Sequence, residues 1–374
     1  GNGDHQGTGR VGGDGVMAKF SEVLTIVNGR NQKQVVCDDG KYPIYGSGGI
    51  MGYANDYICK AETVVIGRKG SINKPIFVET PFWNVDTAFG LCANSEKLNP
   101  KYLYYFCEKF DFEKLNTTVT IPSLTKSNLL NVEIPLPNLE KQKQIVELLD
   151  KITSLISLRK QQLVKLDELV KVRFVEMFGD CKTNPKNWKT KALEKIANVG
   201  SSKRVFVEEL QDSGIPFYRG TEIGALAEKK AVIPALFITE EHYKQLCETT
   251  GKPQKGDLLM PSICPDGRIW IVDTDEPFYF KDGRVLWVHL TSANYNSVFL
   301  LYTLKDRIMT DYASIASGTT FAELKIFALK KCKIFDVPLE LQNQFANFVE
   351  RVDQQKQTVQ QSLEKLELMK KALM

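Results

Sequence analysis

Four glycine-containing segments also carry arginine, lysine, serine or tyrosine, the residue types best suited to bind a nucleic acid. They are 45–49 and 68–74 in the first half of the chain, and 218–221 and 266–268 in the second. Glycine lets a backbone approach a partner closely. Arginine binds a phosphate or the edge of guanine through two hydrogen bonds, and hydroxyl groups bind phosphates or bases. The alternative, that these are ordinary solvated turns, stays open. The candidate DNA-binding residues are Tyr45, Ser47, Arg68, Lys69, Ser71, Lys74, Tyr218, Arg219, Thr221 and Arg268.

The segments that resemble catalytic motifs lack the spacing or the residues that those motifs require. The glycines of 46–52 do not have the spacing of a nucleotide-binding loop, and 67–71 lacks the residue order of a phosphate-binding loop. Residues 184–188 lack the second proline of the Asn-Pro-Pro-aromatic motif of adenine methyltransferases. The chain has three histidines, and its eight cysteines contain no C-x-x-C pair. The sequence therefore predicts no catalytic residue, no metal site and no cofactor.

Length and composition indicate a globular protein of two or three domains. The chain has 374 residues, of which 43% are hydrophobic and 25% are charged. Its net charge of +4 is compatible with nucleic acid as a partner but does not demonstrate it. No apolar run approaches the roughly 18 residues of a membrane span, and the scattered cysteines are typical of reduced thiols. These features predict a cytoplasmic protein without a membrane partner.

The second half of the chain repeats the first at an offset of 200 residues. Residues 139–145 read LEKQKQI, and residues 339–345 read LELQNQF. The match continues without a gap to the C-terminus, and upstream it includes the pairs Ile121/Phe321 and Leu124/Leu324. The chain is therefore two copies of one module, in which a mixed region precedes a long helical tract.

Each copy ends in a tract with the pattern of a long helix. From Lys141 to Phe178 there is no proline or glycine, Asn138 is a suitable N-cap, and Gly179 supplies a stop signal. Apolar residues recur every seven positions in both tracts, which favours pairing of the two helices in a coiled coil. The alternative is that each helix packs only on its own globular domain. The predicted seam residues are Leu149, Ile152, Ile156, Leu163, Leu166, Val170, Phe345, Val352, Val359 and Leu366.

The mixed regions combine short β-prone runs, punctuated by glycine, asparagine and aspartate, with local helices expected at 99–114 and 294–312. The predicted fold class is α+β: two pseudo-repeated globular domains separated by two long antiparallel coiled-coil helices. The predicted segments are a disordered leader or cloning remnant at 1–16, a first domain at 17–140, a central helix at 141–179, a second domain at 180–338 and a C-terminal helix at 339–374.

Three blocks of the first copy resemble the first target-recognition domain of type I restriction-modification specificity subunits. They are 42–52 (YPIYGSGGIMG), 65–72 (VIGRKGSI) and the stretch from 120–124 (TIPSL) to 134–137 (IPLP). The Leu-Glu-x-Gln start of both helical tracts is similar to the conserved-region signature of that family. The resemblance covers Met17 to Met374. The second copy departs from it, since it lacks the Gly-Ser-Gly-Gly turn and has IFDVP at 334–338.

The resemblance implies a subunit that reads double-stranded DNA and is not itself an enzyme. Each recognition domain would read one half of a bipartite site, while the helices set the distance between the halves. Two modification subunits would dock on the helices and adjoining domains, and restriction subunits would join them. The alternative is a coiled-coil scaffold that binds proteins without DNA specificity. An enzyme such as a fused methyltransferase-nuclease would need cofactor motifs that the chain lacks.

Overall fold

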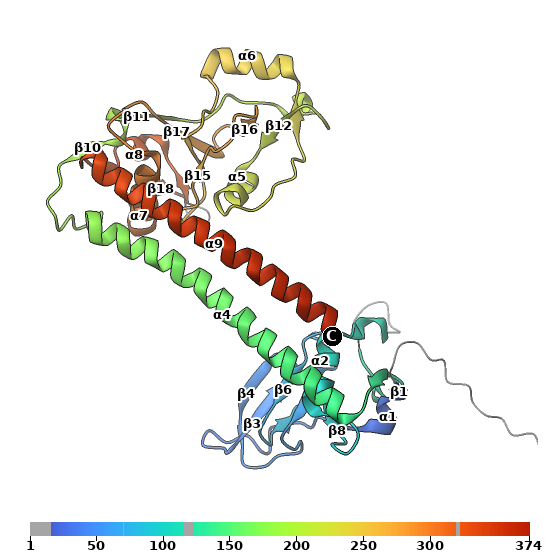
Figure 1. Cartoon of the computed structure of the whole chain (residues 1–374). Coiled ribbons are helices and arrows are strands. Elements are labelled where there is room, and N and C mark those ends of the chain that lie inside the picture. The colour runs from blue at the N-terminus through green and yellow to red at the C-terminus, as the bar shows by residue number, and fades with distance from the viewer. Residues whose placement is uncertain (1–15, 70, 116–122, 319–321) are drawn as a thin grey trace, which may run out of the picture. The chain divides into compact units, whose positions relative to one another are not determined.

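The computed structural model describes residues 16–69, 71–115, 123–318 and 322–374 (Figure 1). The expected leader up to residue 15, the recognition-block residues 120–122 and the repeat pair Ile121/Phe321 lie outside the described residues. Contacts divide the chain into two compact units. Unit 1 combines residues 1–162 with residues 359–374, and unit 2 comprises residues 163–358.

Among its described residues, unit 1 contains three small sheets, the first part of one long helix and the last part of the other. One sheet has the strand order β2-β8-β5-β6, a second has the order β4-β3-β7, and β1 pairs with β9. Val16 belongs to β1 and faces Leu136 of β9, so β1 begins one residue before the expected domain boundary at Met17. The strands are β1 (Val16–Lys19), β2 (Leu24–Asn28), β3 (Tyr42–Gly46), β4 (Gly49–Ala54), β5 (Thr63–Gly67), β6 (Ile76–Val78), β7 (Trp83–Asn84), β8 (Ala88–Ala93) and β9 (Glu133–Leu136). The helices are α1 (Phe20–Val23), α2 (Pro100–Lys109), the 3-10 helix η1 (Phe112–Leu115), α3 (Lys126–Leu130) and the start of α4 (Leu139–Phe178).

Unit 2 repeats these three sheets and adds to them. The order β11-β17-β14-β15 corresponds to β2-β8-β5-β6, β13-β12-β16 corresponds to β4-β3-β7, and β10-β20 corresponds to β1-β9. The strands are β10 (Thr190–Ala192), β11 (Ala197–Gly200), β12 (Ile215–Tyr218), β13 (Phe237–Ile238), β14 (Leu258–Pro261), β15 (Trp270–Ile271), β16 (Tyr279–Phe280), β17 (Val285–Leu290), β18 (Ala316–Ser317), β19 (Glu323–Leu324) and β20 (Lys333–Phe335). The helices are η2 (Leu193–Lys195), η3 (Val207–Glu209), α5 (Gly220–Ala227), α6 (Glu240–Thr250), α7 (Ser297–Ile315), α8 (Ile326–Lys330) and α9 (Leu339–Leu373).

The core of unit 1 lies between its four-stranded sheet and helix α2, whereas the four-stranded sheet of unit 2 packs with Ile223 of α5. In unit 1 the buried side chains Val64, Ile66 and Leu91 of that sheet pack with Leu103 of α2. Helix α2 begins where it does because the side chain of Asn99 accepts hydrogen bonds from the first free backbone N–H groups. Asn296 caps α7 in the same way. The helices expected at 99–114 and 294–312 therefore correspond to α2 with η1 and to α7.

The first turn of each long helix contains a buried glutamine, and the two glutamines bind equivalent backbone groups in the two copies. The Oε1 atom of Gln142 accepts a hydrogen bond from the N–H of Asn99 at 2.8 Å, and its Nε2 donates to the carbonyls of Lys97 and Pro137. Gln342 bonds to the N–H of Asn296 and to two carbonyls in the same pattern. Both side chains are 0% exposed. The Leu-Glu-x-Gln repeat therefore ties each helix to the globular domain that precedes it.

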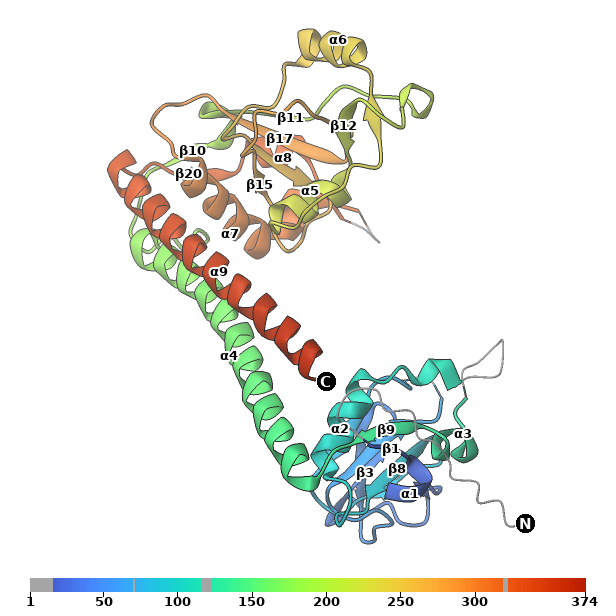
Figure 2. The same ribbon diagram turned by 45° about the vertical axis from the view of Figure 1, so that its right-hand side comes forward.

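Helices α4 (green) and α9 (red) pack against each other in antiparallel directions within each unit (Figures 1 and 2). In unit 2 the ring of Phe174 lies 5.4 Å from that of Phe345, and Asp167 pairs with Lys356 at 2.6 Å. In unit 1 Lys160 pairs with Glu367 at 3.1 Å. The residue numbers rise on one helix as they fall on the other. The expected α+β class, with two repeated domains and two long helices that pack together, is confirmed.

Candidate nucleic-acid interface

Four of the candidate residues of unit 1 gather at the end of β5. Its last residue, Gly67, has no room for a side chain, because a Cβ there would lie 2.7 Å from the carbonyl oxygen of Ser71 and 2.8 Å from the Cβ of Ser47. The turn between β3 and β4, which contains Ser47, therefore contacts the segment that follows β5. Arg68 and Lys69 come directly after this glycine and are exposed.

The other two candidates of unit 1 are placed differently. The ring of Tyr45 packs edge-on against Phe82, with centroids 5.4 Å apart, so this half-buried side chain packs against a buried cluster of the domain. Lys74 is exposed between β5 and β6. Among the described residues, no hydrogen bond or ion pair joins Lys74 to the group around Gly67.

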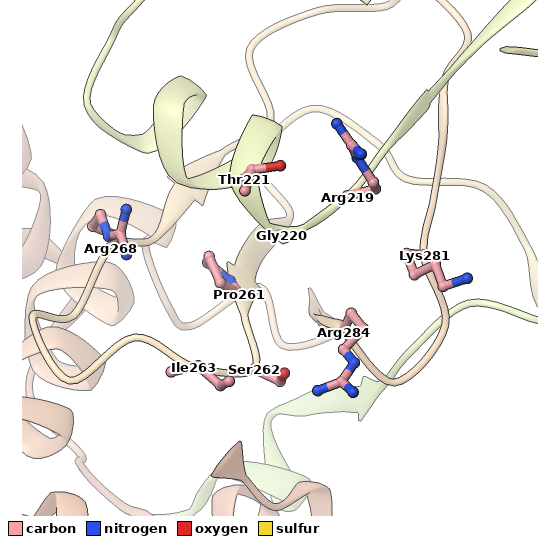
Figure 3. A pocket seen from close by; sticks show the side chains of 9 residues that line it. All are labelled: Arg219, Gly220, Thr221, Pro261, Ser262, Ile263, Arg268, Lys281 and Arg284. Carbon is pink, nitrogen blue, oxygen red and sulfur yellow. The ribbon is translucent and has the colours of Figure 1, made fainter. Parts of the chain in front are cut away.

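In unit 2 the candidates Arg219, Thr221 and Arg268 line one hollow of about 440 Å³ (Figure 3). Three segments distant in sequence form its wall: the junction of β12 with α5, the end of β14 with the following turn, and the segment before β17. The lining residues are Arg219, Gly220, Thr221, Pro261, Ser262, Ile263, Arg268, Lys281 and Arg284. Four of these nine carry a positive charge, so the wall is suited to an anionic or hydrogen-bond-accepting partner.

Each arginine of the wall is paired with a carboxylate. Arg219 binds Glu222 through Nη2 at 2.6 Å and Nε at 3.3 Å. The Nε atom of Arg268 lies 2.8 Å from Asp266. Arg284 pairs with Glu323 of β19. These carboxylates offset much of the charge of the wall and restrict the rotation of the guanidinium groups.

The pair of Arg219 and Glu222 sits on a helix start, which corrects the expectation of a turn at 218–221. Residues from Gly220 onward are helical in α5, because the Glu222 carboxylate accepts a hydrogen bond from the backbone N–H of Arg219 at 3.0 Å. Burial alone would raise the pKa of Glu222, but hydrogen bonds from Arg219 and Thr221 outweigh it and lower the pKa to about 2. Glu222 therefore stays ionised at neutral pH.

Sequence reasoning missed three polar residues of this wall, Ser262, Lys281 and Arg284. Arg284 comes directly before β17, and Ser262 comes directly after β14, so a position at a strand end was the available signal. Tyr218 was expected here, but its ring packs against Phe278 at 5.5 Å, and it does not line the hollow.

The predicted seam residues lie along the packed helices. Ile156, Leu163 and Leu366 are half-buried. The remaining seven are buried: Leu149, Ile152, Leu166, Val170, Phe345, Val352 and Val359. Among the described residues there is no cluster of three or more histidine, cysteine, aspartate or glutamate side chains arranged to hold a metal. Nor does any helix in the described ranges have the length and apolarity to cross a membrane.

A family model described as the type I restriction modification DNA specificity domain matches residues 14–168 and again residues 185–368. The chain belongs to this family. The two matches reproduce the internal repeat, because each specificity domain comprises one globular region and most of the long helix that follows it. The resemblance seen in the sequence is confirmed.

Named relatives match nearly the whole chain. A Haemophilus influenzae protein that bears the name of a type I restriction enzyme specificity subunit is 27% identical over 363 residues, which cover 89% of this chain and 86% of that protein. The type I restriction enzyme MjaVIII specificity subunit of Methanocaldococcus jannaschii is 22% identical over 386 residues, covering 96% of this chain and 82% of its own.

Solved structures share the fold of this specificity-domain chain. One, described as the structural basis of complex assembly and conformational transition of the type I R-M system, has a TM-score of 0.62 at 16% identity and covers 98% of both chains. The type I restriction-modification system S subunit from M. genitalium has a TM-score of 0.59 at 16% identity, covering 97% of this chain and 96% of its own. These chains therefore share their fold with this chain at low sequence identity.

Proposed function

We propose that this chain is the non-catalytic DNA-reading subunit of a type I restriction-modification complex in the cytoplasm. Each globular domain, at 17–140 and 180–338, reads one half of a bipartite site in double-stranded DNA. The observation that carries this proposal is the double match to a DNA specificity domain, on two copies of one strand framework. In both copies, cationic side chains gather at the end of the corresponding strand, β5 in one and β14 in the other.

The long helices at 141–179 and 339–374 set the distance between the half-sites and dock two modification subunits, which restriction subunits then join. Two nearly equivalent helix starts suit two copies of one partner. A row of exposed apolar side chains beside the seam of α4 supports docking by packing. Its members are Leu148 (43% exposed), Leu155 (43%), Leu158 (56%), Leu169 (45%) and Val172 (64%).

The experiment that tests this function maps adenine methylation across the genome of cells that carry the modification subunit, with and without this chain. We expect methylation at a split, asymmetric sequence only when this chain is present. Methylation that does not depend on the chain would contradict the proposal. A purified complex without salt-sensitive affinity for DNA would instead favour the coiled-coil scaffold.

A further inference from the structure

The two domains share a backbone framework in which individual positions can be equated through their hydrogen bonds. In unit 1, β3 runs parallel to β7, and the N–H of Val85 donates to the carbonyl of Tyr45 at 3.0 Å. In unit 2, β12 runs parallel to β16, and the N–H of Lys281 donates to the carbonyl of Tyr218 at 2.9 Å. Tyr45 therefore corresponds to Tyr218, and the residues that follow them, Gly46 and Arg219, also correspond.

A second set of bonds equates the ends of the central strands. The N–H of Arg68 donates to the carbonyl of Thr87, and the N–H of Leu124 donates to the carbonyl of Arg68. The N–H of Ser262 donates to the carbonyl of Arg284, and the N–H of Leu324 donates to the carbonyl of Ser262. Arg68 thus corresponds to Ser262, and Thr87 corresponds to Arg284.

At these two equated positions, the copies carry an arginine and a hydroxyl side chain in opposite order. Unit 1 has arginine at the end of the central strand (Arg68) and a hydroxyl on the neighbouring strand (Thr87). Unit 2 has a hydroxyl at the first position (Ser262) and arginine at the second (Arg284).

The carboxylate partner changes together with the arginine. Glu323, which binds Arg284, precedes Leu324 and therefore stands where unit 1 has Ser123. In unit 1 the Arg68 guanidinium instead lies 5.9 Å from the centroid of the Phe89 ring. The acidic residue Glu323 is thus found in the copy in which an arginine lies beside it.

An arginine held by a carboxylate is better suited to read a base than to neutralise a phosphate. Its charge is already offset, so it contributes less to salt-dependent attraction. A guanidinium has five donors, and Glu222 uses one on Nε and one on Nη2 of Arg219, which leaves three donors free, including one on each Nη atom that together form an end-on pair. That pair matches the O6 and N7 acceptors of guanine in the major groove.

From this arrangement we infer which residues determine specificity in the two recognition domains. In the second domain, Arg284 and Arg219 read guanine from the hollow, and Glu323 and Glu222 are positioning residues that orient them. In the first domain the base-reading arginine is Arg68, at the position equated with Ser262, and its guanidinium lies near the Phe89 ring. The two half-sites are thus read by the same framework with the guanidinium group placed on different strand ends. This inference rests on the proposed function.

The test assembles the complex with its modification subunit and measures both the methylated sequence and the binding of cognate and non-cognate duplexes. Arg284→Ala should relax one base pair of one half-site and reduce discrimination roughly tenfold to a hundredfold. Arg68→Ala should change the other half-site. Arg284→Lys should not restore recognition, because an ammonium group lacks the two-donor fork.

Glu323→Gln separates positioning from simple structural support. Loss of this negative charge should strengthen binding to non-cognate DNA while it weakens discrimination, a combination that general destabilisation does not produce. The matched control is Arg204→Ala, which removes an exposed arginine paired with Asp282 that does not line the hollow. Its half-site sequence should be unchanged.

Two outcomes distinguish this inference from the function on which it rests. If the parent complex methylates a bipartite site, but folded Arg284→Ala and Arg68→Ala variants retain both half-sites and the original discrimination, the inference is wrong and the proposed function stands. If the parent complex shows no sequence preference, the proposed function itself fails.

Discussion

At the scale of single residues, Gln142 and Gln342 are notable because each fully buried side chain makes hydrogen bonds with three backbone groups. Leaving a buried donor or acceptor without a partner costs about 1–3 kcal/mol for each group. A glutamine that bonds to one N–H and two carbonyls therefore contributes more to stability than its own contact area indicates.

Gln142→Ala should destabilise unit 1 by about 2 kcal/mol, since three hydrogen bonds of one buried side chain are lost together. Gln144→Ala is the matched control, because it changes the same residue type on an exposed position of the same helix. Amide hydrogen exchange should show faster opening around Lys97 and Asn99 only in the first variant. Equal exchange in both variants would contradict this role of Gln142.

Single residues of the candidate interface differ in whether the sequence alone indicates them. Arg219 and Arg268 stood out because glycine adjoins each of them, and both line the hollow. Arg284 did not, because it enters the wall only through the pairing of β14 with β17. That register depends on long-range packing, which a local pattern does not encode.

At the scale of elements, the long helices were the most predictable part of the fold. Asn138 caps α4 as expected, since its side chain accepts a hydrogen bond from the N–H of Lys141 at 2.8 Å. Helical geometry begins two residues before the expected Lys141, at Leu139. The helix ends at Phe178 because Gly179 adopts a φ of +86°, which favours glycine. Local capping chemistry is visible in a sequence, and so these ends could be placed within two residues.

The exposed apolar row of α4 makes a testable docking surface. Leu158→Glu should reduce the number of modification subunits bound per chain, which native mass spectrometry should count as two for the parent protein, because a charge in an apolar contact is costly. Gln161→Glu introduces the same side chain at an exposed polar position of the same helix and serves as control. A folded Leu158→Glu variant that still binds two subunits would exclude the row from docking.

The role of the helices in spacing is tested by lengthening both of them together. One heptad inserted after Gln162 in α4 and another after Thr358 in α9 fall at the boundary of the two units. The ion pairs Lys160–Glu367 and Asp167–Lys356 then keep their partners. Seven residues add about 10.5 Å of helix, and a base pair rises about 3.4 Å.

We expect methylation mapping of this double insertion to show both half-sites unchanged and a spacer longer by about three base pairs. Circular dichroism and partner binding establish first that the variant is folded. An unchanged spacer in a folded variant would show that the helices do not set the distance. A changed half-site would show that reading and spacing are not divided between domains and helices.

At the scale of the whole molecule, the repeats of the sequence and the units of the structure do not coincide. Each sequence copy ends with its own helix, but the last 16 residues of the chain, which include the end of α9, belong to unit 1. There, Lys370 pairs with Glu108 of α2 at 2.9 Å, and Met374 packs against the cluster around Tyr105 and Leu149. Sequence periodicity revealed the two helices and their seam, but not which unit each half of a helix would join.

Leu363→Ala tests this division of the chain. Leu363 is 6% exposed, and truncation of a buried leucine costs about 2–5 kcal/mol. Hydrogen exchange should therefore rise in unit 1 and remain unchanged in unit 2 away from α9. Leu368→Ala, at a position 66% exposed on the same helix, is the control. Faster exchange throughout unit 2 would show that the two units do not respond separately.

The division also has a consequence for the order in which the protein matures on the ribosome. Domains generally fold as units during synthesis, the N-terminal one first. Here the contiguous unit 2 has all of its residues once Thr358 has been added, whereas unit 1 needs residues 359–374 as well. The domain that is translated first is therefore completed last, and until then the buried face of α4 near Leu149 lacks its helical partner. A chain that ends at Thr358 and has left the ribosome should present that face to chaperones, although it contains every residue of unit 2.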